Sequence, residues 1–95
     1  MNTIINTAKF SIDEKLEKFI NEKVAKLDRM IDRAVKCEVF LKIDKPESDN
    51  NKIVEMRLYV PGNDLFVTKQ ANTFEQAASD CVDALMLQIE KYKNA

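Results

Sequence analysis

Basic side chains at helical spacing are the residues of this sequence whose pattern points most directly to a chemical role. Between residues 11 and 33, five of them follow at intervals of three, four or eight positions, and they are Lys15, Lys18, Lys26, Arg29 and Arg33. Lys23 lies on the other flank of the same apolar stripe, and Lys91 and Lys93 close a second predicted helix. Ammonium and guanidinium groups in such a stripe can neutralise the phosphates of a nucleic acid.

The same cations also have an ordinary structural explanation. Cations in the last turn of a helix offset its macrodipole, and each contributes about 0.3–1 kcal/mol. Glu22–Lys26 and Glu14–Lys18 have the i,i+4 spacing of ion pairs on a helix surface. From the residues alone, phosphate binding and a solvated helix face therefore both remain open.

Other side chains offer little for catalysis or metal binding. The sequence has no His, so no Ser-His-Asp or Cys-His system can form within it. Cys37 and Cys81 lack the spacing of a zinc site and are expected to be buried thiols in a reducing compartment. Asp80 and Asp83 lie on a predicted exposed helix face without a partner acid. We therefore expect a protein that is not an enzyme and that uses no cofactor or metal.

Composition and charge restrict the class of protein further. Of the 95 residues, 45% are hydrophobic and 33% are charged, which is typical of one small folded domain spanning residues 1–95. The net charge is −1, yet residues 9–45 carry ten basic and eight acidic side chains, whereas residues 46–95 carry five and eight. The near-neutral total therefore conceals a local excess of positive charge. No signal peptide and no membrane-spanning run is recognisable, so we expect a cytoplasmic protein without a membrane partner.

Hydrophobic periodicity predicts the elements that must position these residues. Strands are expected over residues 2–6, 35–43, 54–60 and 65–71, because β-branched or alternating apolar residues fill these segments. A first helix of about five turns is expected behind a capping box at Ser11–Glu14, with Ser11 as its N-cap and an apolar stripe that extends from Leu16 to Ile31. A second helix, ending near Tyr92, should follow another capping box at Thr73–Gln76.

The resulting order, β-α-β-β-β-α, predicts an α+β fold. A right-handed crossover makes the first two strands parallel, and two hairpins complete a four-stranded mixed sheet with two parallel helices on one face. The C-termini of both helices should then lie at one end of the domain, beside the Pro61–Asp64 turn. Lys26, Arg29 and Arg33 are expected to approach Lys91 and Lys93 there.

Two further groups of side chains have less specific patterns. Tyr59, Phe40 and Phe66 are candidates to stack nucleic-acid bases on the open face of the sheet, although Phe66 can also belong to the core. Met86 and Leu87 lie at the margin of the second helix's apolar stripe. They either widen its contact with the core or form a self-association patch.

Three segments resemble one known family over essentially the whole chain. They are FSIDEKLEKFINEKVAKLDRMIDR (10–33), LYVPGNDLFV (58–67) and FEQAASDCVDALMLQIEKYK (74–93). The family is that of ribosome hibernation promoting factor and the ribosome-associated inhibitor protein Y, also known as sigma-54 modulation proteins. The resemblance implies a fold similar to a double-stranded RNA-binding domain, which agrees with the order of elements predicted above.

The resemblance also implies a function that is not enzymatic. Members bind the small ribosomal subunit and its rRNA in the mRNA/tRNA channel, inhibit translation under stress or in stationary phase, and stabilise idle ribosomes. They act on no small-molecule substrate. The chain resembles the short type, without a C-terminal dimerisation domain, so that joining two ribosomes needs another factor. Basic residues match those of the family at Lys23, Lys26, Arg29, Lys91 and Lys93.

The sequence departs from the family within the second helix. Members usually have Arg or Lys in the segment that reads Ala84-Leu85-Met86-Leu87 here. Each lost phosphate contact removes one counterion-release term, so affinity for rRNA should be lower and less dependent on salt. The alternative function is a protein-interaction or weakly homodimeric module that keeps the fold.

Overall fold

The computed structural model describes residues 1–94, which form four strands and two helices in the order β-α-β-β-β-α. The elements are β1 (Asn2–Thr7), α1 (Glu14–Asp28), β2 (Lys36–Ile43), β3 (Lys52–Val60), β4 (Asn63–Ala71) and α2 (Phe74–Lys93). This is the predicted order, and the ends of every predicted strand lie within two residues of the observed ends.

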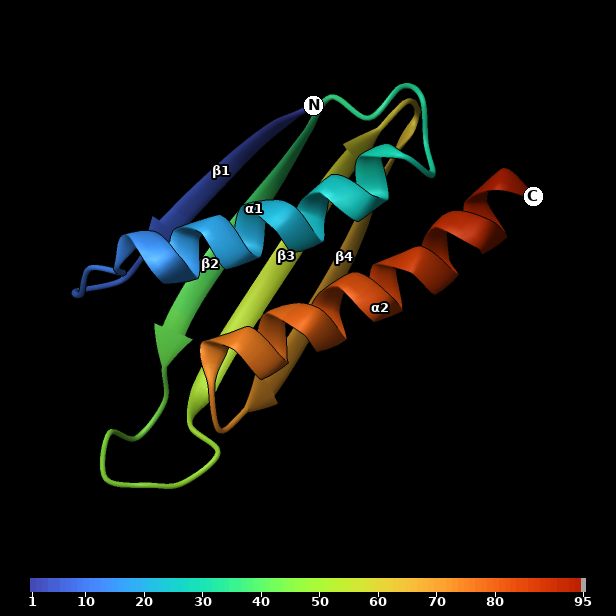
Figure 1. Cartoon of the computed structure of the whole chain (residues 1–95). Coiled ribbons are helices and arrows are strands. Elements are labelled where there is room, and N and C mark those ends of the chain that lie inside the picture. Colours follow the sequence, from blue (N-terminus) through green and yellow to red (C-terminus); the bar gives the residue numbers. More distant parts are fainter. Residues whose placement is uncertain (95) are drawn as a thin grey trace.

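The sheet has the strand order β1-β2-β3-β4, with β1 parallel to β2 and the other neighbours antiparallel. The chain therefore crosses over through α1 and then makes two hairpins, as expected (Figure 1). At the centre of the sheet, Val39 lies opposite both Ile5 on β1 and Met56 on β3. Val39 and Met56 are fully buried, so this register brings the apolar residues of the strands onto one face.

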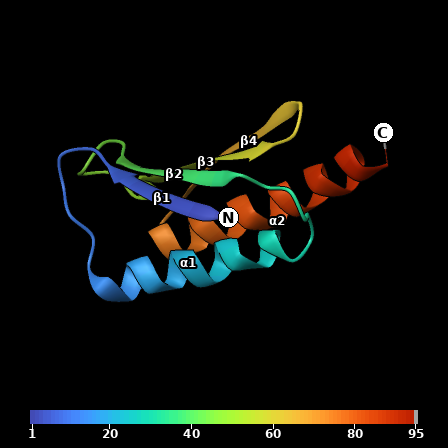
Figure 2. The ribbon, with the colours of Figure 1, turned by 90° about the horizontal axis from the view of Figure 1, so that it is seen from above.

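Both helices cover that face of the sheet and run in the same direction (Figure 1). Figure 2 shows the two layers, with the strands on one side and the helices on the other. The helices and the strands enclose one hydrophobic core, whose largest members include Ile20, Leu27, Leu41, Leu58 and Leu85. The predicted α+β architecture with two parallel helices on one sheet face is therefore confirmed.

The start of α2 follows the prediction, whereas the start of α1 corrects it. Thr73 Oγ1 accepts a hydrogen bond from the backbone N–H of Gln76 at 3.1 Å, as an N-cap does. In α1 the N-cap is Asp13 and not Ser11, because Asp13 Oδ1 accepts from the backbone N–H of Leu16 at 2.8 Å. A carboxylate at this position also interacts favourably with the helix dipole, which favours Asp13 over a hydroxyl two residues earlier.

The end of α1 also differs from the prediction, because the helix stops at Asp28 and not near Ile31. The backbone N–H of Met30 donates to the carbonyl of Leu27 at 3.0 Å, which is the tighter bond of a 3₁₀ turn. Ile31 is buried nonetheless. Its place in the apolar pattern therefore reflects packing of the chain after the helix has ended.

The alternation predicted for residues 35–43 is confirmed in the middle of the segment and fails at its ends. Cys37, Val39 and Leu41 are buried beneath the helices. Val35 is 64% exposed and Ile43 is 39% exposed, although their odd-numbered positions place them on the same face of the strand as the buried residues. Burial here depends on the area that the helices cover, which the alternation alone does not reveal.

Candidate nucleic-acid interface

The C-terminal ends of α1 and α2 meet at one end of the molecule, beside the β3–β4 turn (Figure 1). The hydroxyl of Tyr92, on α2, donates to the carbonyl oxygen of Pro61 at 2.8 Å. Lys93 Nζ donates to the carbonyl oxygen of Met30 at 3.0 Å, two residues beyond the end of α1. Two adjacent residues of α2 thus connect the turn and the loop after α1, and the three segments meet as the topology predicts.

A surface depression of about 390 Å³ lies between these three segments. Its lining residues are Arg29, Met30, Ile31, Asp32, Arg33, Pro61, Tyr92 and Lys93. Three of them are cations and one is a carboxylate, so the depression has an excess of positive charge. It suits an anion such as a phosphate, for which a guanidinium group can donate two parallel hydrogen bonds.

The remaining predicted cations lie outside the depression. Lys26 and Lys91 are exposed side chains in the last turns of α1 and α2. Lys23 is half-buried, and its Nζ lies 5.5 Å from the centroid of the Phe19 ring in a cation–π contact. We define the cationic end as the five residues at the ends of the two helices, Lys26, Arg29, Arg33, Lys91 and Lys93.

Among the described residues, the ion pairs between side chains lie on the sheet and not at the helix ends. Among residues 1–94 the ion pairs between side chains are Lys36–Glu38, Lys42–Glu55 and Arg57–Asp64, at 4.0, 2.9 and 3.7 Å. All three lie on the strands. No side-chain ion pair in this part of the chain includes a residue of the cationic end, and all five side chains are exposed, so their charges can meet an external anion.

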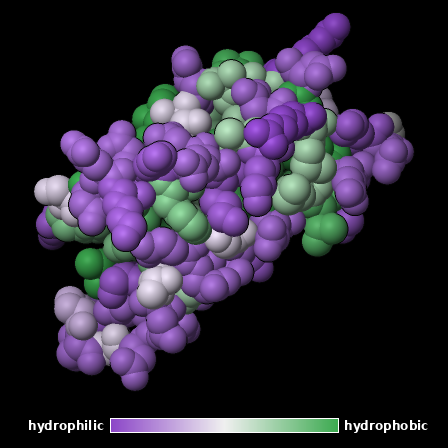
Figure 3. All heavy atoms as spheres, viewed as in Figure 1, coloured by the Kyte–Doolittle hydropathy of each residue, from purple (hydrophilic) through white to green (hydrophobic). Residues whose placement is uncertain are grey.

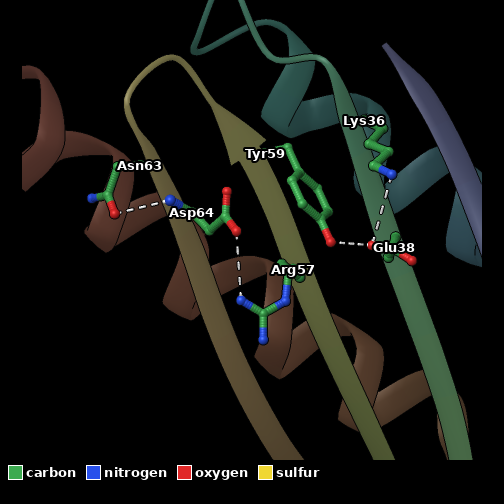
Figure 4. Close-up of polar contacts among 6 residues, drawn as sticks. All are labelled: Lys36, Glu38, Arg57, Tyr59, Asn63 and Asp64. Carbon is green, nitrogen blue, oxygen red and sulfur yellow. Dashed lines mark hydrogen bonds and ion pairs between the residues drawn. The ribbon is translucent and has the colours of Figure 1, made fainter.

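Tyr59, on the open face of the sheet, is already engaged by neighbouring side chains (Figure 4). Its hydroxyl donates to Glu38, and Lys36 Nζ lies 4.6 Å from the centroid of its ring. The hydrogen bond to the Glu38 carboxylate raises the pKa of Tyr59, with a smaller contribution from desolvation. Lys36 therefore already occupies one face of this ring, where a nucleic-acid base would otherwise stack.

Phe66 belongs to the same open face, which decides between the two placements that the sequence left open. It is 43% exposed, and the guanidinium carbon of Arg57 lies 4.8 Å from the centroid of its ring. Arg57 is held there in part by its ion pair with Asp64 (Figure 4). Phe40 is half-buried. The sheet aromatics are therefore not included in the candidate site.

Comparison with known proteins places the chain in a family. The family model described as Sigma 54 modulation protein / S30EA ribosomal protein matches residues 3–95. The chain belongs to this family. The resemblance carried by the three sequence segments is thereby confirmed, although no curated protein matches the chain.

Two solved structures share the fold of this S30EA family member. A ribosomal subunit interface protein from Coxiella burnetii matches with a TM-score of 0.89 at 18% identity, and both chains are covered completely. The N-terminal domain of Protein Y from Thermus thermophilus matches with a TM-score of 0.82 at 21% identity. That match covers 97% of this chain and 99% of the other. At these identities the comparisons concern the fold.

The middle of α2 is where this S30EA family member lacks the expected cations. Met86 is half-buried and packs against the core, which agrees with the core alternative for this residue. Leu87 is 62% exposed. The face of the molecule that carries the helices is mostly hydrophilic, with the apolar surface in separate patches (Figure 3). Neither helix within residues 1–94 is long and apolar enough to cross a membrane.

The two thiols are buried in the core, as predicted. Burial raises the pKa of both Cys37 and Cys81 to about 12. Cys81 Sγ also donates to the carbonyl oxygen of Val54 at 3.2 Å. In the described part of the chain, no group of three or more Cys, Asp or Glu side chains is arranged to hold a metal ion.

Proposed function

We propose that this member of the sigma 54 modulation protein / S30EA ribosomal protein family binds small-subunit rRNA through its cationic end. By occupying the mRNA/tRNA channel it inhibits translation under stress or in stationary phase. The observation that carries the proposal is the gathering of three exposed cations, Arg29, Arg33 and Lys93, around one depression, where none of them has a carboxylate partner within residues 1–94. The family's description and the ribosomal subunit interface protein among its structural neighbours support a ribosomal partner.

The residues that line the depression favour contact with the RNA backbone over recognition of bases. Arg29 and Arg33 can each form a bidentate contact with a phosphate, and Lys93 adds a compact positive charge beside them. Tyr59 and Phe66 are covered by cations and contribute little stacking. Contacts to phosphates position a protein without reading sequence, so binding should depend strongly on salt and weakly on RNA sequence.

Cosedimentation with small ribosomal subunits at low and moderate salt tests the proposal. The test variant is Arg29→Glu/Arg33→Glu, which reverses both guanidinium charges in the depression. The matched control is Lys15→Glu/Lys18→Glu, which changes the net charge equally on exposed positions near the other end of α1. The control should still cosediment, and the test variant should not.

Three outcomes would contradict the proposal. Absence of cosedimentation by the wild-type chain at both salt concentrations is the first. Equal loss in both variants would mean that total charge, and not the cationic end, determines binding. Undiminished binding by Arg29→Glu/Arg33→Glu would remove the depression from the interface.

The dependence on salt supplies a quantitative check. The logarithm of the binding constant falls with the logarithm of salt concentration by about 0.7–0.9 for each phosphate that is neutralised. Because the cationic end holds five cations, the slope should not be steeper than about −4.5. A markedly steeper slope would require a larger interface than the one proposed.

A protein-interaction module is the second candidate, and the exposure of Leu87 favours it. This apolar side chain is 62% exposed on a helix where the family usually carries cations. Self-association through α2 should then be lost in Leu87→Lys, as measured by sedimentation velocity. A chain that fails to cosediment with small subunits but forms such a dimer would support this candidate over rRNA binding.

A further inference from the structure

The two edges of the sheet are protected to different degrees. The β4 edge carries Asp64 and Lys69, and the side-chain amide of Gln88 on α2 donates to the carbonyl of Phe66 at 2.9 Å. The β1 edge reads Asn-Thr-Ile-Ile-Asn-Thr, without charge or Pro, and its register with β2 is continuous, without a bulge. Native proteins use charges, Pro, bulges or a covering element to keep edge strands from pairing. β1 has none of the first three.

The backbone of β1 has hydrogen-bonding groups directed away from the sheet. The N–H groups of Asn2 and Ala8 donate to carbonyls on the β2 side, those of Val35 and Leu41. Because successive residues of a strand direct these groups to opposite sides, the odd-numbered residues Thr3, Ile5 and Thr7 direct theirs outwards. Figure 1 shows no other element of residues 1–94 along this outer side, and residues 8–13 turn away at its C-terminal end.

Side chains of β1 are partly exposed on both faces of this edge. Thr3, Ile5 and Thr7 are half-buried and line a groove of about 320 Å³ between β1 and the start of α1, together with Phe10. On the opposite face Ile4 is 40% exposed. The edge therefore offers unbonded backbone groups beside the exposed apolar side chain of Ile4.

We propose that β1 pairs antiparallel with β1 of a second copy of this chain, which joins the two sheets into one. Under twofold symmetry, each residue of β1 must lie opposite a residue whose side chain is on the same face of the joined sheet. In addition, only the odd-numbered residues have outward backbone groups that can exchange hydrogen bonds with the second copy. The register centred on Ile4 satisfies both conditions, with Thr3 opposite Ile5 of the second copy and Asn2 opposite its Asn6. It also keeps the second copy clear of residues 8–13, which leave the sheet after Thr7.

The side chains of this register complement one another, which selects a second copy as the occupant. Ile4 faces its own copy in a non-hydrogen-bonded pair, where Cα atoms approach to about 4.5 Å. Thr3 and Ile5 form β-branched pairs, a combination that stabilises neighbouring strands. Neither copy brings a charged side chain into the six-residue strand. A single six-residue strand makes a small interface, so we expect weak association, with a Kd of about 0.1–1 mM.

Amide hydrogen exchange followed by NMR across a concentration series tests the pairing at single residues. The N–H groups of Thr3 and Ile5 should exchange quickly in dilute protein and become protected as the concentration rises. Those of Ile4 and Asn6, which point towards β2, should change little. Sedimentation velocity over the same range should show a dimer.

Ile4→Lys places like charges directly opposite each other at the symmetry axis and should weaken the dimer by at least about tenfold. The matched control is Ile43→Lys, because Ile43 is 39% exposed and lies on β2 beyond the residues that pair with β1. Thr3→Pro provides a second variant, since it removes an outward N–H and leaves the β1–β2 hydrogen bonds in place.

A dimer that survives Ile43→Lys and is lost in Ile4→Lys and Thr3→Pro would support the proposal. A chain that stays monomeric at about 1 mM would overturn it. So would equal weakening by Ile4→Lys and Ile43→Lys, or a dimer lost only in Leu87→Lys, which would place the interface on α2. None of these outcomes depends on whether the chain binds rRNA.

Discussion

Replacing Tyr92 by Phe and Lys93 by Met separates the two roles of the end of α2. Tyr92→Phe removes only the hydroxyl that donates to Pro61, and it leaves the ring in place. Lys93→Met removes the ammonium that donates to Met30 and keeps an unbranched apolar stem. Both variants lose one tie to a neighbouring segment, but only Lys93→Met loses a charge.

The expected losses of stability are similar in the two variants. A hydrogen bond contributes about 0.5–1.5 kcal/mol net, and these two lie in exposed surroundings where water can replace the lost donor. We therefore expect about 0.5–1 kcal/mol for each, which lowers Tm by roughly 2–8 °C in a chain of this size. Because the two residues are adjacent and both tie α2 to neighbouring segments, the losses in the double variant need not add.

Binding to an rRNA fragment should distinguish the variants where stability does not. Lys93→Met should make the salt dependence shallower by about 0.7–0.9, the contribution of one phosphate contact. Tyr92→Phe should leave that slope unchanged. Thermal unfolding by circular dichroism and titration of a labelled small-subunit rRNA fragment at several salt concentrations measure the two quantities.

Two results would refute this reasoning. If both variants reduce the slope equally, the shape of the cationic end, and not the charge of Lys93, controls binding. If neither variant changes Tm, the two hydrogen bonds do not hold the three segments together. Lys93→Arg serves as a control, because it should keep the salt slope of the wild-type chain.

Three further predictions concern other parts of the molecule. Leu87→Arg adds a cation where the family resemblance led us to expect one, and it should raise rRNA affinity and steepen the salt dependence of binding. An unchanged slope would place this part of α2 outside the interface. Because the unfolded thiols titrate near 9 and burial raises the pKa of Cys37 and Cys81 to about 12, the unfolded state loses these protons first. Below pH 9 the thiols should therefore not affect the midpoint of urea unfolding. Between pH 9 and about 12 the midpoint should fall, and it should fall less in a variant with Ala at positions 37 and 81. Finally, Asp13→Ala should cost about 1 kcal/mol in thermal unfolding and Ser11→Ala almost nothing, and the reverse order would restore Ser11 as the N-cap.

The sequence predicted the fold well where its local pattern and its packing agree. The alternation around Val39 and the cap at Thr73 each identify an element that tertiary contacts then reinforce. The end of α1 was predicted too late because Ile31 continues the apolar period although the chain has left the helix. No Gly or Pro marks the helix end, and the turn towards β2 follows from packing.

The candidate site was predictable in its position but not in its connections. Parallel helices were enough to bring Arg29 and Arg33 towards Lys93. The hydrogen bond from Lys93 to Met30 joins residues 63 positions apart, and no local pattern encodes it. Likewise, the cation over Phe66 depends on the register of β3 with β4, which is set by the assembled sheet.

The mixed sheet also determines the order in which the chain can assemble. Short connections join β2, β3 and β4. The partner strand of β1 is β2, which begins 29 residues after β1 ends. Closing the longer loop costs more chain entropy, so we expect the hairpins to form first and β1 to dock last. During synthesis β1 emerges before its only neighbouring strand. In the folded protein the same strand should be the first to detach, which makes the N-terminus the least stable cooperative unit of the chain.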